Sequence, residues 1–474
     1  MSLDTKAKSP PPGLIFSGWA VLGFSLLALS TALARFSPFF GYSYEVIDMP
    51  VIWLAGGMAL AGLIYFSLLW LIPAAKYLSR PRMQMLLWVV LALGLFMRLA
   101  QFSSEPALED DFQRYLWDGA VAANGLNPYA VSPDAAKTAN PSISMHGRLA
   151  TESGQVLDRI NHPHLRTIYP PVAQAVFALS YRLGPWSLTA WRGIILVLDL
   201  ATIALVLLML RELGRSPLWA SLYWWNPIVV KELFNAAHME AIVIPLVLAG
   251  LALLIRKRPL AATSALTLAA GAKLWPVILL PLVWRTMLNT PRKLAFAVSL
   301  AALGGILFAW PILSAGLDPE SGFVAYASRW KTNSALFPLL ETMTGPMAAR
   351  ALIAVTLAAI VAWQCRTPIT DSRDAILRAL IILTALFLLS PAQFPWYYLW
   401  VLPLLCLMPI PGLLVLTGTL PLYYMSFYFL PRGTYESFSQ GIVWLIWLPA
   451  WSLLLWQGRN KIANLMTSRL GRTA

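Results

Sequence analysis

Charged side chains are scarce in this sequence, and acidic ones most of all. Asp, Glu, Lys and Arg together make up 12% of the 474 residues, whereas 58% are hydrophobic. A soluble domain normally carries about twice that charge, so the composition excludes a soluble globular protein. Cysteine is almost absent as well. Cys365 and Cys406 both fall in or at the ends of predicted helices, which argues against a disulfide framework or a cysteine metal site.

The sequence is instead rich in long apolar segments. They are long enough to cross hydrocarbon as helices, which takes roughly 20 residues each, and they lack the period-two alternation of barrel strands. The sequence therefore predicts an all-α fold, a polytopic transmembrane helical bundle of about 12 to 14 spanning helices. We expect residues 1–474 to form a single integral-membrane domain, in which residues 14–34 are an uncleaved anchor.

The charge that is present is unevenly distributed. The net charge is +14, which on a soluble protein would suggest nucleic acid. If both termini are cytoplasmic, most Lys and Arg residues fall in cytoplasmic turns and most acidic residues fall outside, as the positive-inside rule predicts. The basic excess therefore orients the chain among membrane lipids, and we expect no nucleic-acid partner.

One long polar excursion, residues 103–186, interrupts the apolar pattern on the predicted outer side. It carries Glu109, Asp110 and Asp111 soon after an apolar segment. Adjacent carboxylates repel one another and lose hydration near lipid, so at least one should have a raised pKa or meet a cation. A carboxylate of this kind suits a general base.

Two helices are predicted within this outer loop. Residues 111–124 place apolar side chains at helical spacing, so we expect an amphipathic helix along the membrane interface, ended by Gly125 and Pro128. Residues 171–183 are apolar but short. If they spanned the membrane, every later basic turn would move outside, so we predict a juxtamembrane helix.

Cationic and polar side chains recur in later turns on the same predicted side: His238, Lys273, Arg329 and Lys331. A helical bundle could bring them together with the acidic residues over one cavity. A carboxylate facing cations suits a reaction in which an acceptor hydroxyl is deprotonated while an anionic phosphate leaves. Because nucleotides are not expected on the outer side, we predict a lipid-phosphate donor that arrives through the bilayer.

The order of the motifs resembles a known family. The acidic pair after an early transmembrane helix is followed by Asp111-x-x-x-Tyr115, Gly125-x-Asn127-Pro128-Tyr129 and Tyr169-Pro170-Pro171. Together these are similar to the integral-membrane GT-C glycosyltransferases, and most of all to the bacterial polyprenol-phosphate-mannose-dependent mannosyltransferases. Asn226-Pro227 followed by Glu232 and His238 resembles the family pattern as well, and the likeness covers residues 86–403.

The resemblance implies a function. The protein would be a glycosyltransferase that moves a sugar, such as the hexose mannose, from a polyprenyl-phosphate donor to a hydroxyl of a lipid or glycan acceptor. The site would face the periplasm from the bacterial cytoplasmic (inner) membrane. Asp111 matches the family's general base and Asp110 is the second candidate. Single displacement would invert the anomeric centre, because no second carboxylate acts as nucleophile.

The resemblance also implies a set of substrate-binding residues: Glu109, Arg114, Tyr115, Asn127, Tyr129, Tyr169, His238, Lys273, Arg329 and Lys331. No cofactor is implied. A divalent metal could bind near three acidic residues, but the chemistry does not require one, and we expect none.

Other interpretations remain open. The acidic residues could complement the dipole of a helix, His238 could be a satisfied interfacial histidine, and Lys273 and Lys331 could merely snorkel. A transporter or flippase of a lipid-linked glycan would also need cations and aromatic residues, although transporters tend to show internal repeats and ionisable groups near the bilayer midplane. A ligase or polymerase that uses a diphosphate-linked oligosaccharide is a closer alternative. The sugar and the acceptor stay open.

Overall fold

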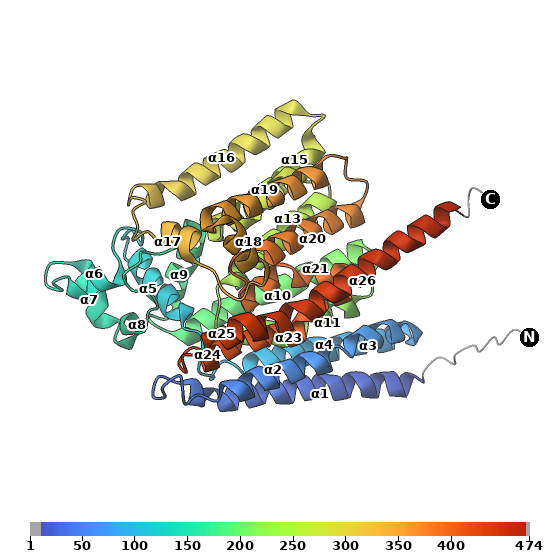
Figure 1. The fold of residues 1–474 in the computed structure, drawn as a ribbon, viewed down its shortest axis with the longest axis horizontal. Coiled ribbons are helices and arrows are strands. Elements are labelled where there is room, and N and C mark those ends of the chain that lie inside the picture. The colour runs from blue at the N-terminus through green and yellow to red at the C-terminus, as the bar shows by residue number, and fades with distance from the viewer. Residues whose placement is uncertain (1–10, 471–474) are drawn as a thin grey trace, which may run out of the picture. The chain divides into compact units, whose positions relative to one another are not determined.

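The computed structural model describes residues 11–470, with side chains up to residue 459, and its regular elements are helices (Figure 1). Within residues 11–470 there is no β-strand, and an isolated bridge joins Thr332 to Ala392. The prediction of an all-α fold is therefore confirmed.

In this range, eight helical segments are long and apolar enough to cross a membrane: Pro12–Phe40, Val51–Tyr77, Arg80–Leu99, Leu188–Glu212, Pro291–Leu313, Pro346–Cys365, Pro411–Phe429 and Tyr435–Arg459. Three shorter apolar helical segments, Glu240–Ile255, Pro259–Ala272 and Trp275–Met287, accompany them. These segments agree with the predicted polytopic bundle. The eight long segments are fewer than the predicted 12 to 14 spanning helices, because that number included shorter apolar segments.

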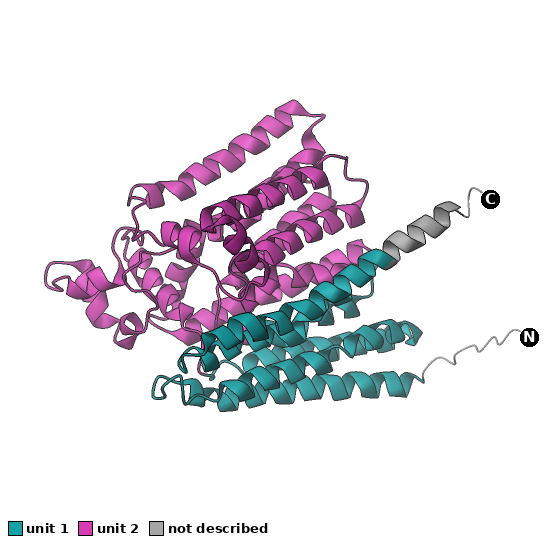
Figure 2. Ribbon diagram, viewed as in Figure 1, with its two compact units in different colours: residues 1–104, 214–230, 409–474 teal, residues 105–213, 231–408 magenta. Residues whose placement is uncertain are grey.

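The helices form two compact units (Figure 2). The first consists of the chain up to residue 104, residues 214–230 and the chain from residue 409 on, and the second consists of residues 105–213 and 231–408. Each unit is thus assembled from separate stretches of sequence.

The first unit holds the N-terminal helices and the C-terminal ones. Its helices are α1 (Pro12–Phe36), α2 (Val51–Tyr65), α3 (Leu68–Ala74), α4 (Arg80–Leu99), α11 (Ser221–Trp224), α12 (Pro227–Val229), α22 (Pro411–Leu414), α23 (Leu416–Thr419), α24 (Ser426–Phe429), α25 (Tyr435–Ser437) and α26 (Val443–Leu470). Helix α1 packs on α2 and α4. A Cβ at Gly62 would lie 2.4 Å from the Gly418 Cα, so only glycine allows α2 and α23 to approach so closely.

The second unit holds the outer loop and the central helices. Its helices are α5 (Asp111–Ala123), α6 (Pro133–Thr138), α7 (Met145–Glu152), α8 (Gln155–Asp158), α9 (Pro171–Leu183), α10 (Leu188–Glu212), α13 (Glu240–Ile255), α14 (Pro259–Ala272), α15 (Leu280–Trp284), α16 (Pro291–Leu313), α17 (Gly322–Arg329), α18 (Leu336–Thr344), α19 (Pro346–Cys365), α20 (Ser372–Leu389) and α21 (Leu402–Leu407). The short helices α5 to α9 and α17 gather at one end of this unit (Figure 1).

Both helices predicted in the outer loop are present. Helix α9 has the predicted bounds, and Pro171 at its first turn suits a helix start. Helix α5 ends one residue before the predicted end, and Gly125 follows with φ of 74°, the left-handed conformation common after a helix.

The surroundings of α5 differ from the prediction of an amphipathic helix at the interface. Every residue from 112 to 121 is buried, including the polar side chains of Gln113, Arg114 and Asp118. The reason is that α9 covers one side of the helix, while the loop before α9 accepts the hydrogen bonds of its arginine.

Candidate active site

The acidic run lies at the start of α5, where Asp111 is the first helical residue. Just before the run, Leu108 adopts φ of 61°. Left-handed backbone at a residue other than glycine costs roughly 1 to 3 kcal/mol and is concentrated at functional sites. Acidic side chains at a helix N-terminus also meet the positive end of the helix dipole. The backbone conformation at Leu108 and the start of α5 therefore set the position of the acidic run.

The Asp111 carboxylate is held by two tyrosines and remains 34% exposed. The hydroxyl of Tyr115, one turn further along α5, and the hydroxyl of Tyr169 both donate to Asp111 Oδ2 at 3.4 Å. Burial, followed by neighbouring charges that include Asp111, raises the pKa of both tyrosines well above its ordinary value, so they remain donors. A general base must be within reach of the proton that it accepts, and the partial exposure of Asp111 meets this requirement.

The two preceding acidic residues have perturbed pKa values. Burial, assisted by the charge of Asp111, raises the pKa of Asp110 to about 7, although Asn161 Nδ2 donates a 2.7 Å hydrogen bond to Asp110 Oδ1. Burial raises the pKa of Glu109 well above its ordinary value, and the positive charge of Lys231 opposes this effect. The acidic run therefore does not carry three full negative charges at neutral pH, as expected for adjacent carboxylates.

His238 lies beside Asp111, from a segment more than 100 residues later in the chain. Its Nδ1 is 3.8 Å from Asp111 Oδ2, and its Nε2 is 3.4 Å from Glu232 Oε2. The imidazole stacks on the indole of Trp396, with ring centroids 3.9 Å apart and planes at 23°. The structure thus joins the acidic run to the predicted His238, as the motif order suggested.

A π-helix, Val230–Asn235, carries Glu232 and ends at Asn235. Asn235 Oδ1 accepts a 3.0 Å hydrogen bond from the backbone N–H of Ala107, and its Nδ2 donates to the Glu105 carbonyl at 2.8 Å. Short π-helical turns are frequent at functional sites because they re-aim side chains. Asn235 thereby attaches the backbone just before the acidic run to the segment that presents Glu232.

Close packing of α5 on α9 sets the position of the Asp111 carboxylate. A Cβ at Gly119 would lie 2.4 Å from the Phe177 carbonyl oxygen, so glycine is required at this crossing. Tyr115 stacks on the Phe177 ring, with centroids 4.8 Å apart and planes at 13°. Gln174 Nε2 donates to Asp118 Oδ2 at 3.2 Å across the same interface. The tyrosine that binds Asp111 is thus fixed by packing on α9.

Two predicted substrate-binding residues, Asn127 and Tyr129, hold the loop together. Asn127 Oδ1 accepts from the Tyr129 backbone N–H at 3.0 Å, and Asn127 Nδ2 donates to the Pro311 carbonyl at 2.9 Å. The Tyr129 hydroxyl donates to the Tyr169 carbonyl at 2.7 Å. The Gly-x-Asn-Pro-Tyr motif therefore supports Tyr169, and the Tyr169 hydroxyl faces Asp111.

Arg114 is buried and forms hydrogen bonds with the loop before α9. Its guanidinium donates to the carbonyls of Leu165 at 3.1 Å, His162 at 3.0 Å and Asn161 at 3.3 Å. These bonds hold the turn that presents Asn161 to Asp110. The geometry therefore assigns Arg114 to the loop rather than to a leaving phosphate.

Lys273, another predicted cation, is held by an acidic and an aromatic side chain. It pairs with Glu240, and its ammonium lies 4.6 Å from the ring centroid of Tyr397, a favourable position for a cation on a π-face. The charge of Glu240 is one of the causes that raise the pKa of Tyr169, so the ion pair lies within electrostatic range of the hydroxyl that binds Asp111.

The other two predicted cations lie elsewhere in the same unit. Lys331 donates to Glu341 Oε2 at 2.7 Å, and Arg329 is exposed at the end of α17. Within the described part of the chain, neither has a hydrogen bond or an ion pair with the acidic run. The structure brings together the acidic residues, Tyr115, Tyr169 and His238, and the predicted roles of Arg329 and Lys331 stay predictions.

Several partners in this site, Glu232 and Glu240 among them, were missing from the predicted set. Asn161 and Asn235 act through single amide hydrogen bonds that no spacing rule reveals. Trp396 lies in an aromatic turn that a membrane aromatic belt explains equally well. Among the side chains described up to residue 459, no group of three His, Cys, Asp or Glu residues is arranged to hold a metal ion.

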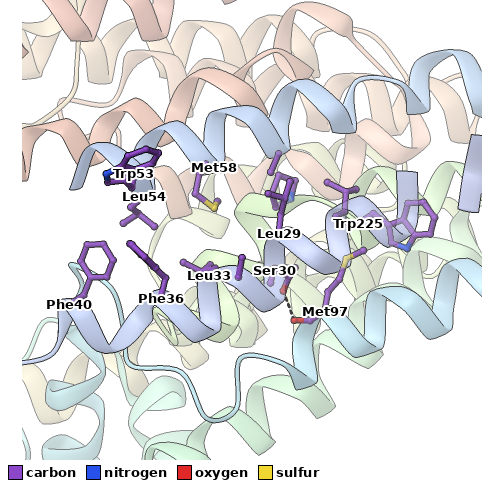
Figure 3. A pocket seen from close by; sticks show the side chains of 16 residues that line it. Leu29, Ser30, Leu33, Phe36, Phe40, Trp53, Leu54, Met58, Met97 and Trp225 are labelled. Atoms are coloured by element: carbon purple, nitrogen blue, oxygen red, sulfur yellow. Dashed lines mark hydrogen bonds between the residues drawn. The ribbon is translucent and has the colours of Figure 1, made fainter. Parts of the chain in front are cut away.

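An apolar pocket of about 220 Å³ lies in the first unit, between α1, α2 and α4 (Figure 3). Leu29, Phe40, Trp53 and Met58 are among its lining side chains. The hydroxyl of Ser30, also in the lining, donates to the Met97 carbonyl at 2.9 Å. The lining contains no titratable group, so the pocket suits a hydrocarbon chain rather than a charged or sugar ligand.

The fold and the site together define a polytopic, all-α membrane protein with a carboxylate cluster at the start of a buried helix. Residues 19–289 match the family described as "Alpha-(1->6)-mannopyranosyltransferase, N-terminal domain". This match covers more than half of the chain, and the chain belongs to that family. It confirms the resemblance to integral-membrane mannosyltransferases, and its range includes the acidic run, His238 and Lys273.

The chain is also similar to the Alpha-(1->6)-mannopyranosyltransferase A of Mycobacterium tuberculosis. It is 24% identical over 335 residues, which make up 63% of this chain and 61% of the relative. The matched region thus spans about three fifths of the relative's length. No solved structure matches the chain.

Proposed function

We propose that this protein is a mannosyltransferase that moves a mannosyl residue from a polyprenyl-phosphate donor to a hydroxyl of a lipid or glycan acceptor. The observation that carries the proposal is the Asp111 carboxylate, which is partly exposed, held by two tyrosine hydroxyls and located in the region that matches the family. Asp111 is the base in this scheme.

The reaction is a single displacement. The acceptor oxygen forms a bond to the anomeric carbon, its proton passes to Asp111 Oδ2, and the bond from the anomeric carbon to the phosphate oxygen breaks with its electron pair going to phosphate. One displacement inverts the anomeric centre. An α-(1→6) product, as the relative's name describes, would then require a β-linked donor and the primary hydroxyl of a mannosyl acceptor.

Charge on the leaving phosphate needs a cation close to the reacting atoms. Lys273 is the candidate, because its pairing with Glu240 keeps it within electrostatic range of Tyr169. Neither a metal nor another cofactor is needed in this scheme, since the base is a carboxylate and the leaving group is an anion already.

A lipid-linked donor also needs a place for its hydrocarbon chain. Helices that are long and apolar enough to cross a membrane would let such a chain stay in the bilayer. We place the protein in the cytoplasmic membrane of a bacterium with its site facing the periplasm, because the positive-inside rule puts the acidic run on that side.

The direct test is to incubate purified protein in detergent with labelled polyprenyl-phosphate mannose and mannose-containing acceptors. The parent should transfer label, and Asp111→Asn should reduce the rate by about 100-fold or more, as expected for the loss of a general base. Asp134→Asn, at an exposed residue of the same outer loop, is the matched control. Equal transfer by Asp111→Asn and the parent would contradict the assignment of the base, and absence of transfer by the parent would contradict the proposed donor.

A further inference from the structure

The imidazole of His238 lies between two carboxylates that differ in exposure. Asp111, on the Nδ1 side, has a side chain that is 34% exposed, whereas Glu232, on the Nε2 side, is 1% exposed and the imidazole itself is fully buried. The row of three groups therefore runs from the open side of the site into the protein. The distances of 3.8 and 3.4 Å are longer than hydrogen bonds, and catalytic hydrogen bonds are often long before substrate binds.

Neither ring nitrogen of His238 has a hydrogen-bond partner among the described residues. A buried histidine with a purely structural role normally satisfies at least one of its nitrogens. Here both nitrogens face acidic oxygens instead, so a proton gained by the ring would be stabilised on both sides. The ring is therefore suited to accepting a proton.

The backbone places the ring in this position at a cost. Ala237, directly before His238, adopts φ of 61°, and the His238 backbone N–H donates to the Glu232 carbonyl at 2.9 Å. The stack on Trp396 then fixes the plane of the imidazole. Two independent constraints, one on the main chain and one on the ring, thus aim the nitrogens at the carboxylates.

The charged groups around the ring are mostly acidic. Asp110 and Asp111 face it from the start of α5, and Glu232 faces it from the π-helix. Beyond them, Lys231 acts on the buried Glu109. The 3-10 helix Pro395–Trp400 contributes the uncharged indole of Trp396. The imidazole is therefore surrounded mainly by acidic side chains.

We propose that His238 and Glu232 are positioning residues that hold Asp111 for the reaction and take over the proton that Asp111 removes from the acceptor. The inference rests on the proposed function. The proton moves from the acceptor hydroxyl to Asp111 Oδ2 and then to His238 Nδ1, so the Asp111 carboxylate is regenerated. Glu232 stays ionised and stabilises the imidazolium. After the product leaves, the proton returns through Asp111 to solvent water, and no other reactant is needed.

The test is the pH dependence of kcat for the parent, Glu232→Gln, Glu232→Asp and His238→Gln. Protonation of His238 before the reaction blocks the transfer, so activity should fall on the acidic side. Removal of the Glu232 charge makes the imidazole harder to protonate, so the acidic limb of the kcat–pH profile should move to lower pH in Glu232→Gln. The maximal kcat of this variant should fall by about 10-fold or more. Glu232→Asp retains the charge and should keep the limb of the parent. KM for the donor should stay within about twofold, because the side chains of His238 and Glu232 are 0% and 1% exposed.

Asp134→Asn, at an exposed residue of the outer loop, is the matched control. It removes a carboxylate that lies outside the row of Asp111, His238 and Glu232. Its acidic limb should coincide with that of the parent. An unmoved limb in Glu232→Gln would overturn the proposal even if His238→Gln failed to fold. Activity retained by Asp111→Asn would instead overturn the proposed base, so the two failures are distinguishable.

Discussion

Asp110→Asn should stabilise the protein, and more strongly at alkaline pH than at acidic pH. The half-buried Asp110 carboxyl has a pKa of about 7, compared with an ordinary value of 3.8. Between these two values the folded protein keeps a proton that the unfolded chain has lost. Folding stability therefore falls as pH rises from about 4 to about 7, and the whole cost is present above about pH 7.

The size of this cost follows from the pKa difference. The difference is roughly three pKa units, and one unit corresponds to 1.36 kcal/mol, so ionised Asp110 costs about 4 kcal/mol near pH 8 and about 2 kcal/mol near pH 5. Asparagine is nearly isosteric and keeps an oxygen that can accept the hydrogen bond of Asn161. The substitution should therefore remove most of the cost without opening a cavity.

The assay is thermal unfolding of the purified protein in detergent at both pH values. Asp110→Asn should unfold at a higher temperature than the parent, with the larger gain near pH 8. Asp134→Asn, at an exposed position in the same outer loop, should show no such difference between the two conditions. An equal gain at both pH values, or a loss near pH 8, would refute the reasoning that burial and the charge of Asp111 destabilise ionised Asp110.

Other predictions follow from the packing and from the proposed chemistry. Gly119→Ala should separate α5 from α9 and lower the unfolding temperature, because its Cβ would clash with the Phe177 carbonyl. Asn235→Leu should leave two backbone groups of the segment before the acidic run unsatisfied, at about 1 to 3 kcal/mol each, measurable as a lower unfolding temperature. Treatment with EDTA should leave the transfer rate unchanged, and a loss that Mg²⁺ or Mn²⁺ restores would contradict the metal-free scheme.

Helices α5 and α9 of the outer loop were predicted well because their signals are local, whereas the short helices α6, α7 and α8 were not predicted. The proline at residue 171 and the glycine at residue 125 mark a helix start and a helix end, and both boundaries agree with the structure to within one residue. The burial of α5 was not predictable in the same way. A loop some 50 residues later in the chain covers its polar face and accepts hydrogen bonds from Arg114. Hydrophobic periodicity contains no information about such a partner.

The same distinction applies to the candidate site. Glu109, Asp110, Asp111 and Tyr115 are adjacent or one helical turn apart, so their proximity could be read from the sequence. The contact of His238 with Asp111 depends on tertiary packing, and only the motif order of the family suggested it. Asn161 and Asn235 could not have been selected, because a single asparagine side chain has no distinguishing spacing in the sequence.

The physical cost of the site argues against the simpler view that the acidic residues only complement a helix dipole. An exposed carboxylate near a helix N-terminus stabilises the helix by only about 0.3 to 1 kcal/mol. Here burial raises the pKa of Glu109 and of Asp110, and both Leu108 and Ala237 have strained left-handed backbone. Each of these features lowers stability, and close packing of α5 on α9 must offset them. Because backbone strain and carboxyl groups with raised pKa gather around the partly exposed Asp111 carboxylate, the arrangement favours the proposed chemistry at Asp111 over a role in helix stability alone.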